Sequence, residues 1–561
     1  MGGGKIQLQA IGKENNYLTI NPQISFFKSV YKKYSNFAMQ SIKLDFESID
    51  TLSFDKDTKL KLKLEKNADL INTMFFEVKL PTVINTDRYE FKWIDNLGAA
   101  LIKSARIIIG GDVIEEYDSN YMYIYHNNFL TNEKKNMYDV LAGNKLKNEY
   151  NNISDNPNIP ILTRDRLRIP LPFWFHRNIG LSLPIFALEY NDVILELVLR
   201  PIKELCMFKS VTSTITLVPA LDINGLNINH DSIPNNSLTT IPDINLNDFF
   251  VNNRWDLEPS VDVNYIFIDK SDRELFGNSN LRYLVEPVSK TVLNDLSGEI
   301  VNHIQLYHQV KELYIVGQRN DVEKRNMWLN FTNFDDDYET NYLDYQNNFF
   351  RLSSLKSKST TGTTALQYLG AFTSPNRLTT LKLSSLDWST QLDINEDVII
   401  NSNDSYIKNE NENDINNILD IWKYRPYEHI PYIGNESYKF YTENVIEELE
   451  IFFDQVERVS MRESRYYNLI QPYVSGLSNN AKQVLLYSFS LEPYNYQPSG
   501  KCNFNHIKEL VLKMKIKDTS ILPNDIYNYG YDNYKYNVYV YAKYYNILEI
   551  QSGMGQLLFR N

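Results

Sequence analysis

Apolar and polar residues alternate in several short stretches of the chain. Residues 60–64, 193–199 and 510–516 each place an apolar side chain at every second position. A period of two is typical of a half-buried β-strand, because successive side chains of a strand point to opposite faces of the sheet. These stretches therefore predict strands that each bury one face.

A further alternating segment, residues 484–491, places Tyr487, Phe489 and Leu491 on one face. Two prolines and a glycine follow it, and neither residue type suits a central strand. We therefore expect residues 493–505 to connect this strand to the next one. The last alternating segment ends in Ser-Gly-Met-Gly at residues 552–555, which we interpret as a mobile tail because no helix pattern follows.

Two stretches share the order strand, turn, strand, tyrosines. The first turns at Gly110-Gly111, a pair that readily supplies the positive φ of a tight hairpin. The second turns near Asp454-Gln455. The spacing from the turn to the first tyrosine is 10 residues in one stretch (111 to 121) and 11 in the other (455 to 466). This internal similarity is compatible with two copies of one sandwich in tandem.

Length and charge narrow the class of protein. A chain of 561 residues with 43% apolar residues is expected to form two or more domains with sizeable cores. The net charge of −13 argues against a protein that coats nucleic acid, because phosphate contacts need cationic side chains. No apolar run reaches the length of a transmembrane helix or a signal peptide. Gly2 does not begin a myristoylation motif, since Ile6 stands where serine or threonine is required.

Sequence motifs for catalysis or metal binding are missing from the chain. It has no H-E-x-x-H, no phosphate-binding loop ending in Lys-Ser or Lys-Thr, no G-x-S-x-G and no cysteine-histidine cluster. His176 lies among aromatic residues without a second ligand at suitable spacing, so we interpret it as a packed or surface histidine rather than a metal ligand. The acidic triplet at residues 335–337 lacks calcium-loop spacing and is expected to be a solvated turn. We therefore predict no catalytic residue, no cofactor and no metal.

Two features bear on covalent modification. Cys206 and Cys502 are the only cysteines, and we expect both to remain reduced thiols rather than to pair with each other. Five N-x-[ST] sequons are possible glycosylation sites, which we expect to stay unmodified by the secretory route because no signal peptide precedes them. They are Asn152, Asn235, Asn330, Asn403 and Asn435.

Four ordered motifs resemble the major capsid proteins of nucleocytoplasmic large DNA viruses. They are NPQISFFKSVYKKYSNF at residues 21–37, PLPFWFHRNIGLSLP at 170–184, SFSLEPYNYQPSGKCNF at 488–504, and the pair Y-N-x-L and S-G-M-G within 545–555. Relatives tend to carry Asn-Gly at the second hairpin turn, so Asp454-Gln455 leaves the tightness of that turn open.

The resemblance implies an all-β fold: two tandem eight-stranded jelly-roll β-sandwiches with long loop insertions and a few short helices. We expect an N-terminal arm at residues 1–24, a first jelly roll at 25–270, a linker at 271–284, a second jelly roll at 285–555 with a surface insertion at 318–444, and a C-terminal tail at 556–561.

The same resemblance implies a structural virion protein that forms pseudo-hexagonal trimeric capsomers of an icosahedral shell, assembled in the host cytoplasm. Implied partners are two further copies of the chain, neighbouring capsomers and minor capsid proteins beneath the shell, with an inner membrane as an additional contact and no direct nucleic acid binding. Lys28, Lys32 and Lys33 suit a solvated face, or a contact with an anionic layer beneath the shell.

Two alternative functions are compatible with a large β-sandwich. One is a carbohydrate-binding jelly-roll protein of a virion surface or fibre, although the aromatic residues here mostly follow strand periodicity and so suit a core. The other is an enzyme on a sandwich scaffold, which the missing motifs disfavour. A glycan array would separate the first alternative from a capsid protein.

Overall fold

Most of the chain outside residues 332–443 is described by a computed structural model. The described residues are 2–13, 15–46, 51–81, 89–94, 96–143, 166–210, 216–219, 226–228, 255–320, 322, 326–331, 444–477, 483–517 and 534–559. The acidic triplet and most of the predicted insertion at 318–444 therefore lie outside the described residues.

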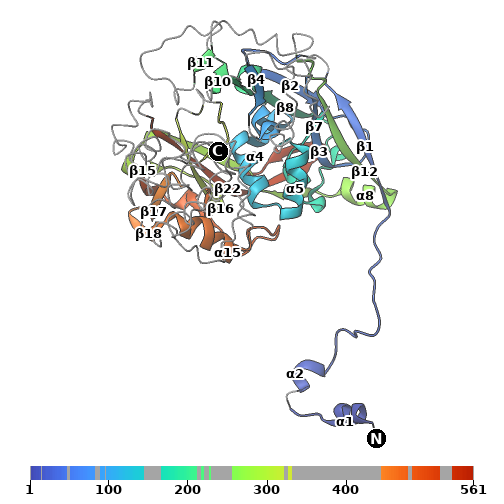
Figure 1. The fold of residues 1–561 in the computed structure, drawn as a ribbon. Coiled ribbons are helices and arrows are strands. Elements are labelled where there is room, and N and C mark those ends of the chain that lie inside the picture. The colour runs from blue at the N-terminus through green and yellow to red at the C-terminus, as the bar shows by residue number, and fades with distance from the viewer. Residues whose placement is uncertain are drawn as a thin grey trace, which may run out of the picture.

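The first sandwich consists of two four-stranded antiparallel sheets (Figure 1), β1-β12-β3-β7 and β2-β8-β5-β6. In β2 every second side chain is buried and the lysines between them are exposed, so the predicted alternation at residues 60–64 is confirmed. The strands are β1 (Phe37–Asp45), β2 (Thr58–Lys63), β3 (Leu70–Lys79), β5 (Ile102–Ile109), β6 (Asp112–Asp118), β7 (Arg166–Pro170), β8 (Val193–Leu199) and β12 (Ser260–Ile268). A small side sheet contains β4 (Tyr89–Trp93), β9 (Cys206–Ser210), β10 (Thr216–Pro219) and β11 (Leu226–Ile228).

The second sandwich repeats this strand order. Its sheets are β14-β22-β16-β19 and β15-β21-β17-β18, with β13, β20 and β23 added to the first of them. Its strands are β13 (Leu281–Val285), β14 (Val288–Leu296), β15 (Gly298–Ile304), β16 (Gln309–Arg319), β17 (Ile446–Phe453), β18 (Val456–Glu463), β19 (Leu485–Ser488), β20 (Cys502–Asn503), β21 (Leu510–Ile516), β22 (Tyr536–Gln551) and β23 (Met554–Leu557). Eight strands in this order form a jelly roll, so the predicted pair of eight-stranded jelly rolls is confirmed.

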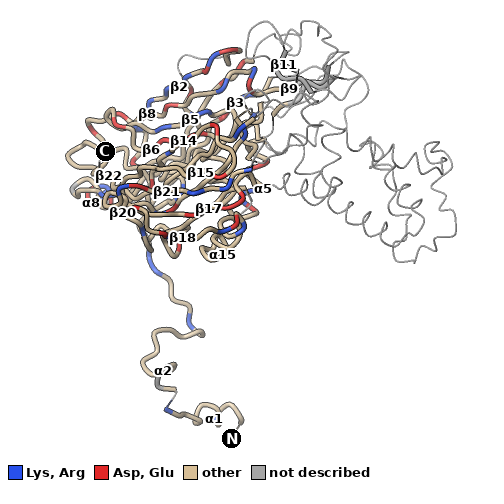
Figure 2. Tube along the Cα trace, turned by 90° about the vertical axis from the view of Figure 1, so that its left-hand side faces the viewer, with Lys and Arg blue, Asp and Glu red and all other residues tan. Residues whose placement is uncertain are grey.

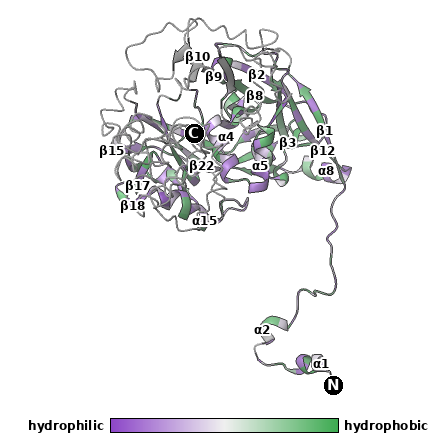
Figure 3. Ribbon diagram, in the orientation of Figure 1, coloured by the Kyte–Doolittle hydropathy of each residue, from purple (hydrophilic) through white to green (hydrophobic). Residues whose placement is uncertain are grey.

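Short helices lie before and between the strands, as predicted. They are α1 (Gly3–Gln9), α2 (Asn15–Thr19), α3 (Leu97–Leu101), α4 (Ser119–Asn128), α5 (Asn132–Leu141), α7 (Trp174–Arg177), α8 (Lys270–Asn278), α15 (Gln471–Ser475) and the single turns η1 (Ile179–Leu181), η2 (Ile185–Ala187), η3 (Ile202–Glu204), η7 (Tyr466–Ile470) and η8 (Phe504–His506). Apolar residues concentrate in the strands of both sandwiches (Figure 3). The proposed linker at 271–284 contains most of α8 and the start of β13, and its boundaries stay predictions.

Residues before β1 extend away from the two sandwiches as an arm that carries α1 and α2 (Figure 1). The arm means all residues before β1, so it includes residues 25–36 of the range predicted for the first jelly roll. Its large apolar side chains are exposed, including Phe26 at 91% and Phe27 at 100%. The arm also carries lysines, whereas acidic residues lie among the basic ones across the sandwiches (Figure 2).

The strand predicted at 484–491 is shorter than expected. It ends at Ser488, and Leu491 is 80% exposed instead of lying on the buried face with Tyr487. The physical reason is local: the Ser488 hydroxyl accepts a hydrogen bond from the backbone N–H of Ser490 at 3.1 Å, which turns the chain out of the sheet. The predicted connection at 493–505 also contains β20, which pairs with β16.

The predicted mobile tail is wrong for the residues that follow β22. Ser552 and Gly553 adopt positive φ angles of 53° and 79° and form a turn, after which β23 pairs back onto β22. The Gly553 carbonyl accepts a hydrogen bond from the N–H of Tyr190 at 3.0 Å, and Gly555 packs against Leu188. The end of the second sandwich is thereby attached to the first.

The second hairpin turn is tight although it contains no glycine. Phe453 pairs with Val456, so only Asp454 and Gln455 form the turn, with φ angles of 46° and 74°. Two positive φ angles match the strand twist of a two-residue hairpin. The Asp454 side chain supports the turn by accepting a hydrogen bond from the N–H of Glu509 at 3.0 Å.

Gln455→Gly is expected to raise the free energy of unfolding by about 0.5–1 kcal/mol, because a left-handed conformation is unfavourable for a residue with a Cβ atom and not for glycine. Urea titration measures the change. Gln455→Ala is the control, since alanine keeps the Cβ atom and should give no gain. An equal gain from both variants would contradict backbone strain as the cause.

Candidate functional site

The two sandwiches share one buried seam, formed by the strands β16 and β22. On β16, Leu313 and Ile315 belong to the core of the second sandwich, whereas Tyr314 and Val316 belong to the core cluster of the first. On β22, Val540 and Tyr541 divide in the same way. The alternation of a strand thus places one set of side chains in each core.

Helix α4 lies between the two sandwiches (Figure 1). It begins directly after β6, where the Asp118 carboxylate caps the helix by accepting a hydrogen bond from the N–H of Tyr121 at 2.9 Å. Tyr121, Tyr125 and Phe129 follow each other at a spacing of four residues, so they lie on one face of the helix.

That aromatic face packs on the second sandwich. The ring of Tyr121 lies 6.4 Å from Tyr314 and 5.9 Å from Tyr541, and the ring of Phe129 lies 6.1 Å from Tyr314. The Lys543 ammonium lies 4.5 Å from the centre of the Phe129 ring. Aromatic pairs at these distances contribute about 0.5–1.5 kcal/mol each beyond the area they bury.

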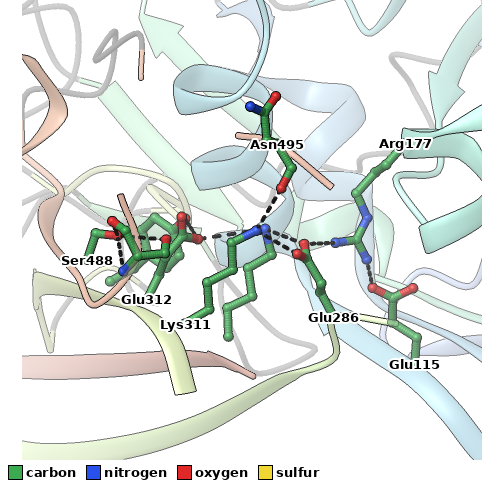
Figure 4. Close-up of polar contacts among 10 residues, drawn as sticks. Glu115, Arg177, Glu286, Lys311, Glu312, Ser488 and Asn495 are labelled. Atoms are coloured by element: carbon green, nitrogen blue, oxygen red, sulfur yellow. Dashed lines mark hydrogen bonds and ion pairs between the residues drawn. The ribbon is translucent and has the colours of Figure 1, made fainter. Parts of the chain in front are cut away.

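A buried charge network crosses the seam (Figure 4). Its centre is Glu286, which comes directly after β13. The Glu286 carboxylate lies 2.6 Å from the Lys311 ammonium, 2.8 Å from the Lys543 ammonium and 3.9 Å from the Arg177 guanidinium. Arg177 belongs to the first sandwich and also forms an ion pair with Glu115 of β6. The Glu115 carboxylate in turn accepts a hydrogen bond from the N–H of Trp174 at 2.8 Å.

The protonation of the network follows from burial and charge. Burial by itself would raise the pKa of Glu286, but Lys543, Lys311 and Arg177 lower it to about 2, so this carboxylate is ionised. Burial raises the pKa of Glu312, although Lys543 lies 3.7 Å away and the Tyr314 hydroxyl donates a hydrogen bond to it at 2.5 Å. A buried network of this kind requires all its members, because a charge that loses its partner is strongly destabilising.

A second polar contact crosses the same seam. The Asp118 carboxylate lies 2.5 Å from the Lys290 ammonium of β14 and accepts a hydrogen bond from the Tyr541 hydroxyl at 2.9 Å. Asp118 therefore caps α4 and also connects the first sandwich to the second.

Two histidines lie beside this seam. The His126 ring of α4 stacks on Tyr138 of α5 with their centres 3.8 Å apart. His176 packs against Phe75 at 5.5 Å, and its Nδ1 accepts a hydrogen bond from the N–H of Met74 at 3.4 Å, as expected for a packed histidine. Burial lowers the pKa of His126 to about 3 and that of His176 to about 4, so both rings are neutral at pH 7.

Asn330, Cys206 and Cys502 take no part in the charge network. Of the five sequons only Asn330 belongs to the described residues; Asn152, Asn235, Asn403 and Asn435 lie outside them. Asn330 is half-buried, and its side-chain amide donates to the sulfur of Met327 at 3.7 Å. Cys206 is buried in the first sandwich, and Cys502 lies in β20 of the second.

Metal ligands and membrane helices are also absent from the described part of the chain. Within it, no group of three or more His, Cys, Asp or Glu residues could hold a metal ion. None of its helices is long and apolar enough to span a membrane.

The fold and the seam define a class of protein: two jelly rolls of one strand order, joined side by side in a single chain. Two family models match the chain, "Major capsid protein N-terminus" at residues 25–269 and "Large eukaryotic DNA virus major capsid protein" at residues 272–556. The chain belongs to the family of large eukaryotic DNA virus major capsid proteins.

Individual relatives and solved structures support this family assignment. The chain is 26% identical over 592 residues to the major capsid protein of Phaeocystis pouchetii virus and 25% identical over 575 residues to that of Paramecium bursaria Chlorella virus 1, with full coverage of both chains in each case. The fold is similar to a chain of the PBCV-1 virus capsid, with a TM-score of 0.56, 20% identity and 96% and 100% of the chains covered. It is also similar to the Faustovirus major capsid protein, with a TM-score of 0.58, 12% identity and 94% and 93% covered. The protein is thus a structural component of a virion capsid.

Proposed function

We propose that three copies of this chain form one pseudo-hexagonal capsomer of an icosahedral shell. The seam carries this proposal, because its shared core and charge network hold two similar sandwiches of one chain side by side. Three such pairs supply six similar lobes, which suit a hexagonal lattice position. The role is geometric, and we propose no catalytic step and no cofactor for it.

The expected mass of the capsomer is about 197 kDa, three times the 65.7 kDa of one chain. Native mass spectrometry of purified protein at the concentration used for shell assembly measures it, and the same sample after denaturation gives the single-chain mass as a control. A stable single chain under native conditions would contradict the proposal.

We further propose that the capsomer contacts neighbouring capsomers and, through its arm, minor capsid proteins beneath the shell or an inner membrane. Support comes from the exposed Phe26 and Phe27, which lie next to Lys28 and close to Lys32 and Lys33. Exposed aromatic residues among cations suit a partner with apolar and anionic groups. Assembly in the host cytoplasm belongs to the same proposal.

We propose that the arm faces the interior of the shell and that the predicted insertion at 318–444 faces outward. Antibodies can test this orientation of the chain. An antibody against residues 2–10 of the arm is expected to leave intact particles unlabelled, because the proposed arm lies underneath. An antibody against residues 401–417, which lie outside the described residues and within the proposed outward insertion, is expected to label them. Opened particles should bind both antibodies. The reverse labelling of intact particles would overturn this orientation.

A further inference from the structure

The two sandwiches carry equivalent helical segments, and only one of these segments is covered. In the first sandwich, β6 ends at Asp118 and α4 follows. In the second, β18 ends at Glu463 and a helical segment follows, which consists of η7 and α15. The residues that lie 3, 7 and 11 positions after the strand end are Tyr121, Tyr125 and Phe129 in the first sandwich and Tyr466, Ile470 and Val474 in the second.

The face of α4 that carries these residues packs on the neighbouring sandwich, whereas in the counterpart Tyr466 is half-buried against its own core and Ile470 and Val474 are exposed. Leu469, Ile470, Tyr473 and Val474 are 52%, 51%, 87% and 72% exposed. Their spacing places them on one side of the helical segment. Clusters of large exposed apolar residues mark interaction surfaces. We name these four residues the η7–α15 face.

Each sandwich also has an equivalent sheet surface on which such a helical face could dock. In the second sandwich, α4 covers the outer face of sheet β14-β22-β16-β19. There the paired residues Lys290, Tyr541 and Tyr314 form one row across three strands. In the first sandwich, Lys43, Asp262 and Phe75 form a row across the equivalent strands β1, β12 and β3. Both rows begin with a lysine and end with an aromatic ring.

This outer face of the first sandwich is exposed along β1 and half-buried farther in, where His176 packs on Phe75. Lys43 is exposed, and Asp262 and Phe75 are half-buried. The neighbouring Ser41 is also exposed and donates a hydrogen bond to Asp262 at 2.9 Å. Figure 1 places β1 and β12 at the right of the molecule, β17 and β18 at its lower left and α15 at its bottom. One chain therefore has one uncovered η7–α15 face and, elsewhere on its surface, one sheet that is exposed along β1.

We propose that the η7–α15 face of one chain docks on the outer face of sheet β1-β12-β3-β7 of a second copy. This contact repeats between chains the contact that α4 makes within a chain. The proposed contact rests on the proposed trimer, and it specifies which surfaces hold the trimer together. A contact between two different surfaces of identical chains generates a ring when the rotation closes, and three chains with two lobes each then close a ring of six.

The internal contact also predicts one ion pair between chains. Within the chain, Asp118 at the end of β6 pairs with Lys290 of β14. The equivalent residues of the proposed contact are Glu463, at the end of β18, and Lys43, on β1 of the second copy. Both side chains are exposed in the single chain. Opposite charges at these positions fit the proposed register of the two copies.

Apolar and charge variants test the contact by native mass and by the dissociation constant of the trimer. Ile470→Asp combined with Val474→Asp is expected to raise this constant at least about 100-fold and leave folded single chains. Val301→Asp on β15 is the matched control, since Val301 is 54% exposed but lies on neither proposed surface, and it should leave the trimer unchanged. Circular dichroism and thermal melting verify that each variant is folded.

A charge swap tests the register and remains informative if the apolar variant does not fold. Glu463→Lys and Lys43→Glu are each expected to weaken the trimer about 10-fold, and the double variant should restore it. A trimeric wild type whose dissociation constant none of these variants changes would overturn the docking surface and leave the proposed capsomer intact. A wild type that is a single chain under assembly conditions would instead refute the capsomer.

Discussion

Replacing Arg177 with methionine is expected to lower the free energy of unfolding by about 3–5 kcal/mol. Methionine retains most of the side-chain volume but removes the charge that faces Glu115 and Glu286. The Glu115 side chain is only 2% exposed, so its carboxylate would remain buried without its cationic partner. Urea titration followed by circular dichroism measures the loss.

Two further variants show whether the charge network is the cause. Lys63→Ala removes an exposed ion pair with Asp192 and is expected to cost less than about 1 kcal/mol. Glu115→Gln combined with Arg177→Met removes both charges of the buried pair and should be less destabilising than Arg177→Met alone. Equal losses for Arg177→Met and Lys63→Ala would show that the buried network contributes little.

Acidification from pH 7 to pH 5 is expected to destabilise the chain by about 4 kcal/mol through His126 and His176, about 2 kcal/mol for each ring. Their folded pKa values of about 3 and 4 lie below the unfolded value of 6.5. The unfolded chain therefore binds more protons between these values, and stability falls as the pH drops below about 6.5. Glu286, with a pKa of about 2, loses its contribution only below about pH 4.5.

Melting temperatures at pH 7, 6 and 5 measure this dependence. His126→Phe keeps the stacking on Tyr138, and His176→Asn keeps an acceptor for the N–H of Met74, so the double variant should show a flatter dependence than wild type. His506→Asn changes an exposed histidine and serves as the control. Parallel curves for wild type and the double variant would contradict the assignment to these two rings.

Alternation of apolar and polar residues predicted several strands of the fold. It could not assign the two faces of a strand that is buried on both sides. Residues 60–64 alternate and begin in β2, whose lysines are exposed. Residues 193–199 and 510–516 also alternate and form β8 and β21, but there Glu196 and Val511, which lie between the core positions, are buried as well. In contrast, β16 is buried along nearly its whole length, because one face lines the second core and the other lies in the seam. Periodicity alone does not reveal which sandwich each face meets.

The charge network left only a partial signal in the sequence. Lys311 and Glu312 interrupt an apolar run, which is unusual for a buried strand and indicates buried partners. Those partners come from distant parts of the chain: Glu286 lies 25 residues before Lys311, and Lys543 lies on the final long strand. No local sequence pattern predicts ion pairs between such distant residues, so the structure was needed to identify them.

Local backbone conformation explains the remaining differences. Asp454 and Gln455 adopt left-handed angles that residues with a Cβ atom seldom accept, so the tightness of this turn could not be predicted from its residue types. Similarly, the glycines of residues 552–555 suggested mobility because glycine is flexible in isolation, whereas here Gly553 and Gly555 permit close contact with Tyr190 and Leu188.

Strand β22 has a consequence for the order in which the protein is made. It lies between β16 on one side and β13 and β14 on the other, yet it is the last in the chain of the eight strands that build the second sandwich. A ribosome releases the chain from its first residue onward, so the central sheet keeps a gap until residue 551 has been translated. Because the same strand supplies Tyr541 and Lys543 to the seam, an incomplete nascent chain can close neither the second core nor the contact with the first sandwich. Products truncated before β22 therefore retain open sheet edges, which are templates for pairing with other chains.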